Sequence, residues 1–523
     1  MVKHVLNVVR MRERKKYVAP FLPFCHSAYI SRVKAQLKKL TTDSAVYGVS
    51  NIVGRFITFL LVPYYSHMLP QAEYGIVITV YSFIAFLNAV FTFGLEPAYM
   101  RYVAETDVRG RNRIFSTSSW FIASASVVLA GVILLLEPQA QALLEISDAW
   151  DAIIPLSLGM IALDAVNVIP FAALRMENRA RFFAMVKITS IVINVGLNVL
   201  FISVLHWSVV SIFLSGLLAS LASTLLLLPV FYSHGRAAID RGMLRELLHY
   251  GLPTMPGAIA IMLIEIIDKP LMLKLAGAAT AGVYGVNYKL GIFMMLVVTV
   301  FRYAWQPFYL QMKDSTETRQ LFARVLTYFV LLGAGIVLLL SLFIGDLVRI
   351  PIPFWNGRVL INPEYLGGIG IVPIILFSYL WAGIAQILNA GLYIEKRTRL
   401  VLAATTSGAA VNIACNLLLI PAWGMYGGAF ATFAAYFTIT VFYAIAVRRI
   451  FPVPWEYARL LRIAAAFSAA ALLWYLLPAP QILGSLLWRI CSLAVFAGIL
   501  FMSGFFLGSE VREFQRIFLR RKR

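Results

Sequence analysis

The chain has few cysteines and few acidic side chains for its length. It carries three cysteines and 24 aspartates and glutamates among 523 residues. Cys25, Cys415 and Cys491 lie far apart without any paired spacing, which argues against a disulfide framework and against a cysteine-based metal site. We therefore expect no redox centre, no metal and no other cofactor.

Charged residues of either sign are scarce as well. They make up 13% of the sequence, against 61% hydrophobic residues and a mean hydropathy of +0.82. This composition excludes a soluble enzyme with a single core and is typical of a polytopic membrane protein. The sequence has no nucleotide-binding fingerprint, so direct use of ATP is not expected.

Long apolar runs, separated by short polar breaks, follow one another along most of the chain. A membrane-spanning helix needs about 20 mostly apolar residues, and the sequence predicts fourteen such helices. We expect an all-α polytopic membrane protein. The predicted spans are 44–66, 74–96, 116–137, 151–173, 182–205, 208–232, 249–275, 283–306, 321–345, 368–393, 398–420, 424–447, 460–477 and 484–508.

The positive charge is distributed unevenly between the loops. With the N-terminus placed in the cytoplasm, 36 of the 45 lysines and arginines fall in cytoplasmic segments, and only Lys274, Arg349 and Arg358 fall in outside loops. This bias follows the positive-inside rule and predicts a multi-pass membrane protein with both termini in the cytoplasm. The net charge of +21 therefore reflects topology, and nucleic acid is not an expected partner.

Two basic tails flank the predicted spans. Residues 1–43 are too polar and too interrupted to form a secretory signal, and we interpret them as a retained cytoplasmic tail. Docking of a partner protein or of anionic lipid is an alternative role for this tail. Residues 509–523 form the second basic cytoplasmic tail.

Short matches between the two halves indicate an internal repeat. The predicted fifth span contains "NVGLN" and the eleventh contains "NIACN", at an offset of 218 residues, while "AEYGIV" and "GVYGVN" match at an offset of 210. Transporters are often built from such repeats around a central site. We expect one lobe over 44–232, a cytoplasmic linker helix over 233–248, a second lobe over 249–448 and two further helices within 449–508.

Several ionisable residues fall inside the predicted spans, where a charge is costly and usually faces a partner or a cavity. Arg55 lies about halfway along the first span, and Asn51 lies on the same helix face. The other residues of this mid-span set are Asp164, Lys187, Glu265, Asp268, Lys269 and Lys289. Drug exporters coupled to protons or sodium need a buried carboxylate as their cation site. A basic residue occupies the centre of the first span here, so the pattern favours a transporter of an anionic ligand over such an exporter.

For some of these residues a structural role is an open alternative. Lys187 and Arg302 lie near the cytoplasmic ends of their spans and could extend to the lipid headgroups. Glu265 and Lys269 are four residues apart and could neutralise each other. The asparagines of the fifth span could join helices or contact a ligand.

The first two spans, "VSNIVGRFITFLLVPYYSHMLPQAEYGIVITVYSF" and "FGLEPAYMRYVAE", resemble the polysaccharide biosynthesis flippases, the lipid-linked oligosaccharide branch of the MATE-like (MOP) superfamily. The segments "YGLPTMPGAIAIMLIEIIDKPLML", "AGVYGVNYKLGIFMMLVVTVFRYAWQPF" and "NLLLIPAWGMYGGAFATFAAY" are similar to the same family. The resemblance covers about residues 44–450.

The resemblance implies two six-helix lobes with MATE-like architecture, two additional helices and a central cavity formed largely by spans 1, 2, 7 and 8. It implies transfer of an undecaprenyl-diphosphate-linked oligosaccharide to the periplasmic leaflet for surface polysaccharide synthesis. Arg55 matches the family's basic position in span 1, and Lys289 matches its Tyr-Lys position in span 8. The family commonly has Asp-Arg where this chain has Asp268 and Lys269, and lysine lacks the bidentate fork of arginine.

These observations predict a transporter rather than an enzyme, acting as a monomer in the bilayer on a lipid-linked oligosaccharide, with polysaccharide polymerases as candidate partners. The substrate-binding residues we expect are Asn51, Arg55, Lys187, Asp268, Lys269, Lys289 and Arg302, and Glu265 and Asp164 are expected to form structural ion pairs. The alternatives are a lipid II flippase, a MATE-type multidrug exporter and a membrane glycan polymerase or ligase. The last is disfavoured because the longest outside loop, about 346–367, contains only two acidic residues.

Overall fold

The computed structural model describes residues 59–147, 150–207, 209–235, 239–310, 315–352, 355, 357–476 and 484–506. Asn51, Arg55, both predicted tails and most of the predicted first span lie outside these residues. Within them the chain is helical and forms no strand, apart from an isolated bridge between Pro351 and Val359. The predicted all-α membrane fold is confirmed.

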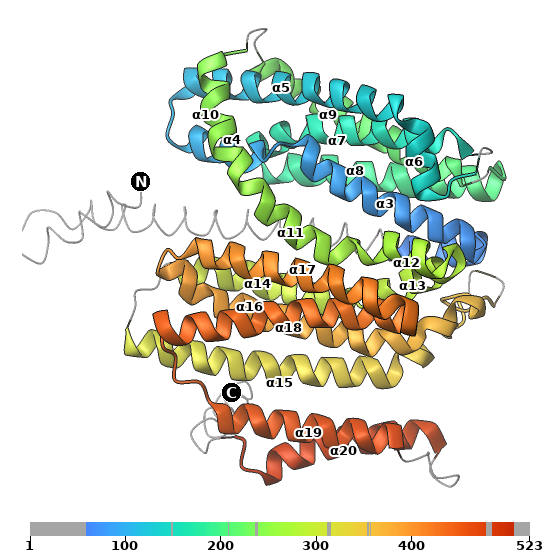
Figure 1. Cartoon of the computed structure of the whole chain (residues 1–523), viewed down its shortest axis with the longest axis vertical. Coiled ribbons are helices and arrows are strands. Elements are labelled where there is room, and N and C mark those ends of the chain that lie inside the picture. The colour runs from blue at the N-terminus through green and yellow to red at the C-terminus, as the bar shows by residue number, and fades with distance from the viewer. Residues whose placement is uncertain are drawn as a thin grey trace, which may run out of the picture.

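The described helices fall into two bundles and an appended pair (Figure 1). Residues 59–68, which precede the first of them, are also helical. The first bundle contains α3 (Gln71–Phe91), α4 (Leu95–Ala104), α5 (Val108–Leu135), α6 (Glu137–Leu144), α7 (Ile153–Met176), α8 (Ala180–Val199), which continues into the π-helix η2 (Leu200–Val204), and α9 (Val210–His234). The second contains α11 (Met255–Ile266), α12 (Asp268–Ala276), α13 (Ala278–Leu290), α14 (Ile292–Leu310), α15 (Thr316–Leu347), η4 (Pro363–Ile371), α16 (Val372–Ile394), α17 (Thr398–Trp423) and α18 (Met425–Ile450). Between the bundles lie α10 (Arg241–Gly251) and η3 (Leu252–Thr254), and the appended pair is α19 (Tyr457–Leu476) and α20 (Gly484–Met502).

The predicted number of fourteen spans is not confirmed by the described part of the chain. Eleven helices there are long and apolar enough to cross a membrane, or twelve if the bent pair of α13 and α14 forms one span. The predicted first span lies mostly outside the described residues, and the apolar part of α20, Leu486–Met502, is shorter than a full span.

The two bundles meet where α3 lies against α12 and α13 (Figure 1). Two glycines make this contact close. A Cβ atom on Gly75 would lie 1.9 Å from the carbonyl oxygen of Ala278, and one on Gly282 would lie 2.0 Å from the carbonyl oxygen of Gln71. Small residues let membrane helices approach backbone to backbone, so the sequence fixes the crossing point of the bundles at these positions.

Two spans of the second bundle are broken near their middle. Helix α11 ends at Ile266 and α12 begins at Asp268, two residues before Pro270, whose ring lacks an amide proton and so removes one helical hydrogen bond. Helices α13 and α14 are joined at Gly291 with a bend of 44°. A Cβ atom on Gly291 would lie 2.4 Å from Cγ2 of Ile375, so glycine allows the bent span to pack against α16. Both breaks lie beside charged residues.

The helix between the bundles begins later than the sequence predicts. The linker helix expected over 233–248 runs from Arg241 to Gly251, because Asp240 caps its start by accepting a hydrogen bond from the backbone of Met243 at 2.9 Å. Its apolar side chain Leu247 is buried, and the helix packs against α4 and α5.

The appended helices pack against α15. A separate apolar cluster joins them, with Leu338 and Leu342 on α15, Ile463 on α19 and Phe496 on α20. Arg459 is buried beside this cluster, with its guanidinium carbon 4.4 Å from the ring centre of Phe505.

Candidate functional site

A buried ion pair lies at the break between α11 and α12. The side chain of Asp268 is fully buried, and its Oδ1 accepts a hydrogen bond from Nζ of Lys269 at 2.8 Å. Nζ also donates to the backbone carbonyl of Glu265 at 2.5 Å, and the Tyr284 hydroxyl donates to Oδ2 of Asp268 at 2.5 Å. Both carboxylate oxygens are therefore satisfied, as a buried charge requires.

Tyrosines from three other helices surround this pair. The ring of Tyr288 lies beneath Lys269, with Nζ 3.8 Å from the ring centre, a distance typical of a cation–π contact. Tyr379 donates to the Tyr288 hydroxyl at 3.4 Å, and Tyr436 donates to the Glu265 carboxylate at 3.3 Å.

The ion-pair partner of Lys269 is thus Asp268, while the carboxylate of Glu265, which the i,i+4 spacing placed beside Lys269, accepts from Tyr436. The Lys269 side chain is only 12% exposed. Its charge is neutralised within the protein before any ligand arrives.

Lys289, unlike Lys269, is exposed. Its side chain is exposed although its neighbours Tyr288 and Leu290 are buried. It lies eleven residues into α13, about 16 Å along the helix axis, beside the bend at Gly291. This exposed cation therefore lies within the apolar span formed by α13 and α14 and away from either of its ends.

The partner of Lys289 belongs to the other bundle. Nζ of Lys289 donates to the Tyr74 hydroxyl at 3.3 Å, and Tyr74 lies on α3. Tyr74 in turn packs against the rings of Tyr65 and Tyr365. This contact was not predicted from the sequence. The internal repeat that aligns Tyr74 with Tyr284 could have indicated it, because both tyrosines form a hydrogen bond with a charged side chain inside the membrane.

The first bundle contains a second, smaller set of charges. The Ser220 hydroxyl donates to Oδ1 of Asp164 at 2.7 Å, and Asp164 interacts electrostatically with Lys187. Nζ of Lys187 also lies 4.2 Å from the ring centre of Phe171. The structure therefore brings Asp164 and Lys187 near each other.

Arg302 lies away from Lys269 and Lys289. It is exposed and lies thirteen residues beyond Lys289 on the same span, about 20 Å along the helix. Its guanidinium carbon lies 5.9 Å from the ring centre of Tyr303.

The repeated asparagines make the same hydrogen bond in both bundles. Nδ2 of Asn198 donates to the backbone carbonyl of Asn194 at 2.8 Å, and Nδ2 of Asn416 donates to that of Asn412 at 2.9 Å. In the first bundle, Tyr65 also donates to the side-chain oxygen of Asn198 at 2.8 Å. These bonds lie within and between helices, which agrees with a packing role for the asparagines.

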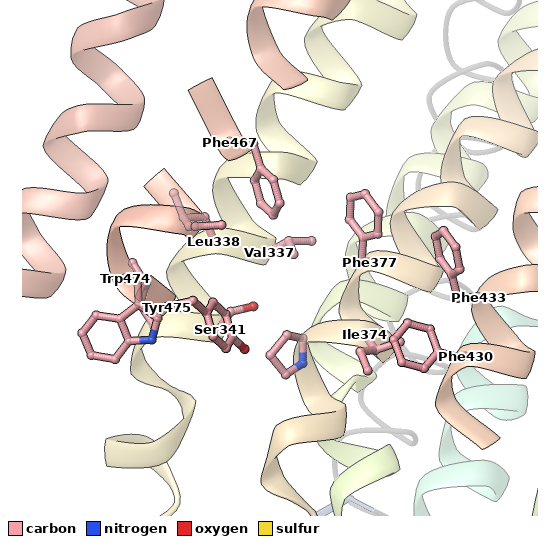
Figure 2. Close-up of a pocket in the computed structure, with 13 residues that line it drawn as sticks. Val337, Leu338, Ser341, Ile374, Phe377, Phe430, Phe433, Phe467, Trp474 and Tyr475 are labelled. Atoms are coloured by element: carbon pink, nitrogen blue, oxygen red, sulfur yellow. The ribbon is translucent and has the colours of Figure 1, made fainter. Parts of the chain in front are cut away.

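A cavity of about 310 Å³ lies elsewhere, where α15, α16 and α18 face α19 (Figure 2). Its lining is aliphatic and aromatic, and Figure 2 shows Phe377, Phe433 and Phe467 facing this space. It contains none of the predicted site residues. In the described ranges, no group of three or more histidine, cysteine, aspartate or glutamate side chains could hold a metal ion.

The sequence is similar to a known protein family and to a known membrane protein. A family model described as polysaccharide biosynthesis protein matches residues 40–313. An uncharacterized membrane protein of Methanocaldococcus jannaschii is 21% identical over 432 residues, which cover 76% of this chain and 83% of that protein.

Solved structures share the fold. The lipid II flippase MurJ in an inward closed conformation has a TM-score of 0.62 at 15% identity, covering 88% of this chain and 99% of that chain. A multidrug resistance MATE family transporter of the MOP superfamily, in an inward-facing conformation, has a TM-score of 0.58 at 14% identity, covering 76% and 94%.

Proposed function

The chain belongs to the polysaccharide biosynthesis protein family, and we propose that it is a flippase for an undecaprenyl-diphosphate-linked oligosaccharide. In this proposal the substrate moves from the cytoplasmic to the outer leaflet of the inner membrane by alternating access, for surface polysaccharide synthesis. Both chain termini are cytoplasmic, and the protein is a transporter rather than an enzyme.

The observation that carries the proposal is the environment of Lys289. An exposed ammonium group within an apolar span is costly unless water or an anion reaches it. Lys289 lies at a helix break and between the two bundles, and both features are typical of transporter binding sites. A lipid diphosphate is an anion that such a group would bind by charge-assisted hydrogen bonds.

The proposed site combines several of the predicted residues. We assign the direct phosphate contacts to Lys289 and to Arg55, and we include Asn51, which the sequence predicts on the same helix face as Arg55. Lys187 and Arg302 extend the positive surface toward the cytoplasmic side. Lys269 reaches the ligand only by exchanging its bond to Asp268, so we assign this pair the role of shaping the site beneath Tyr288.

The physical mechanism follows from charge. Diphosphate cannot cross hydrocarbon without compensation, whereas cationic side chains can neutralise it while the prenyl tail stays in lipid. An inside-negative potential favours outward movement of an anion by about 2.3 kcal/mol per charge per 100 mV. Rocking of the two bundles about their contact would expose the site to each side in turn.

The test is the leaflet distribution of the lipid-linked oligosaccharide in the native host. We expect it to accumulate in the cytoplasmic leaflet when the gene is deleted and when Lys289→Ala replaces the intact protein at equal abundance. Lys396→Ala, which changes an exposed lysine in the turn between α16 and α17, is the matched control and should behave as wild type.

An unchanged distribution in the deletion strain would overturn the oligosaccharide assignment. In that case the leaflet distribution of lipid II is the next quantity to measure in the same strains, since the fold is shared with a lipid II flippase.

A further inference from the structure

The end of the molecule predicted to face outside carries a set of contacts between the two bundles. On the side of the second bundle, these contacts come from the segment 348–365, which joins α15 to α16. Two described parts of it, 348–352 and 357–361, pair through backbone hydrogen bonds, from Ile352 to Arg358 at 2.8 Å, from Leu360 to Ile350 at 3.0 Å and from Ile361 to Val348 at 3.0 Å. It therefore presents its polar groups from a fixed backbone.

These groups bind the chain just before α3. Nε2 of His67 donates to the carbonyl oxygen of Val359 at 2.7 Å, and the backbone amide of Asn362 donates to Oγ of Ser66 at 3.2 Å.

Two further bonds continue the row. The hydroxyl of Tyr365 donates to the carbonyl oxygen of Leu69 at 2.8 Å, and Nε2 of Gln71 donates to that of Glu364 at 2.7 Å. Tyr365 is fully buried, so separating the bundles here would expose its ring as well as break its bond.

A second contact lies at the C-terminal end of α12. Nζ of Lys274 donates to the carbonyl oxygen of Ala142 on α6 at 3.1 Å and lies 3.2 Å from the Glu145 carboxylate. The glycine contact of Gly75 and Gly282 belongs to the same end of the molecule. The two bundles are thus joined at two places in addition to the glycine contact.

We propose that these contacts form an outer clasp, defined by His67–Val359, Ser66–Asn362, Leu69–Tyr365, Gln71–Glu364 and Lys274–Glu145, which holds the outer side closed in the ligand-free protein. Opening to the outside requires that the clasp breaks as a unit, because the short segment 359–365 provides four of its five links. The clasp thereby sets the equilibrium between the inward-open and outward-open states. This inference concerns a conformational equilibrium and goes beyond the choice of substrate.

The test measures the distance between the bundles at the outer end by double electron–electron resonance. Spin labels are attached at Gln139→Cys on α6 and Trp423→Cys on α17, both exposed, in a variant without the three native cysteines. The clasp variant carries His67→Phe, Tyr365→Phe and Lys274→Met, which keep side-chain size while removing the bonds. The control carries His249→Phe, Tyr443→Phe and Lys396→Met, the same changes outside the clasp.

We expect the clasp variant to increase the population of the long outer distance about tenfold over the parent, since several modest hydrogen bonds are removed together. The control should match the parent. A clasp variant that is monodisperse and has the parent distance distribution would overturn the proposal. If the triple variant does not fold, Tyr365→Phe alone should raise the same population about threefold, and an unchanged population would again contradict the clasp.

No substrate is present in this measurement. A failure of the clasp would therefore leave the proposed flippase activity untouched, and a wrong substrate assignment would leave the distance result untouched.

Discussion

Replacement of Lys269 by methionine should destabilise the protein far more than replacement of Lys289. The reason is the environment of Asp268, whose side chain is fully buried and whose Oδ1 is paired with Lys269 at 2.8 Å. Lys269→Met keeps the length and apolar character of the side chain but leaves a carboxylate without its counter-ion in the membrane interior. Lys289, in contrast, is exposed and has the Tyr74 hydroxyl at 3.3 Å as its hydrogen-bond acceptor.

The magnitude follows from what is left after the substitution. Removing one partner of a buried ion pair typically costs about 3–5 kcal/mol. We expect the lower end, about 3 kcal/mol, because the Tyr284 hydroxyl still donates to the Asp268 carboxylate. This corresponds to roughly a hundredfold change in the unfolding equilibrium. The double variant Asp268→Asn/Lys269→Met removes both charges and should recover more than half of the loss.

The assay is equilibrium unfolding in mixed micelles by titration with a denaturing detergent, followed by circular dichroism. Lys269→Met, Lys289→Met and the double variant are compared with the wild type under the same conditions. A Lys269→Met protein as stable as the wild type would refute the reasoning. So would a double variant less stable than Lys269→Met, because the buried pair would then not account for the loss.

Three further predictions concern other parts of the structure. Lys289→Met should weaken binding of an undecaprenyl diphosphate lipid about tenfold to a hundredfold, as expected for the loss of a charge-assisted contact, which isothermal titration in detergent would show. Gly75→Ala should lower the free energy of unfolding by about 1–3 kcal/mol, because the added Cβ would lie 1.9 Å from the Ala278 carbonyl oxygen. The same unfolding titration checks this. Gly131→Ala is the control, because no atom lies within 4 Å of a Cβ added there. Arg459→Met should loosen α19 from α15, because the Arg459 guanidinium donates to the hydroxyl of Tyr328 on α15 at 3.4 Å. Faster hydrogen exchange in α19 with no change in α7 is the expected result, and equal exchange would contradict it.

The sequence predicts the fold class because hydropathy in a bilayer is a strong constraint. Long apolar runs must form helices to satisfy their backbone groups, and the described chain is indeed helical throughout its spans. The number of spans is tested only in part, because most of the predicted first span lies outside the described residues and the apolar part of α20 is shorter than a full span.

The local arrangement of charges is predictable only in part. The spacing of Glu265 and Lys269 suggests an i,i+4 pair on a regular helix, but the break before Pro270 changes the geometry, and Lys269 binds Asp268 instead. The surrounding tyrosines come from α13, α16 and α18, which are far apart in sequence, so no local pattern indicates that they meet. The same holds for Lys289 and Tyr74, whose contact depends on how the two bundles pack.

The contacts of the loop at about 346–367 could not be predicted from the sequence. Its length and two acidic residues argue against a catalytic surface, but they give no indication of its contacts with the other bundle. Those contacts use backbone carbonyl and amide groups of Val359, Asn362 and Glu364, which every sequence provides. Only the fold shows which of these groups face His67, Ser66 and Gln71.

The most direct test of the account is transport in proteoliposomes that contain only the purified protein. A fluorescent undecaprenyl-diphosphate oligosaccharide is placed in both leaflets, and the fraction reached by a membrane-impermeant quencher is followed over time with an applied potential. The account predicts rapid exchange between leaflets with the wild-type protein and with Lys396→Met, and exchange reduced at least tenfold with Lys289→Met. Equal exchange for Lys289→Met and wild type, or no exchange above protein-free liposomes with a correctly folded wild type, would contradict it.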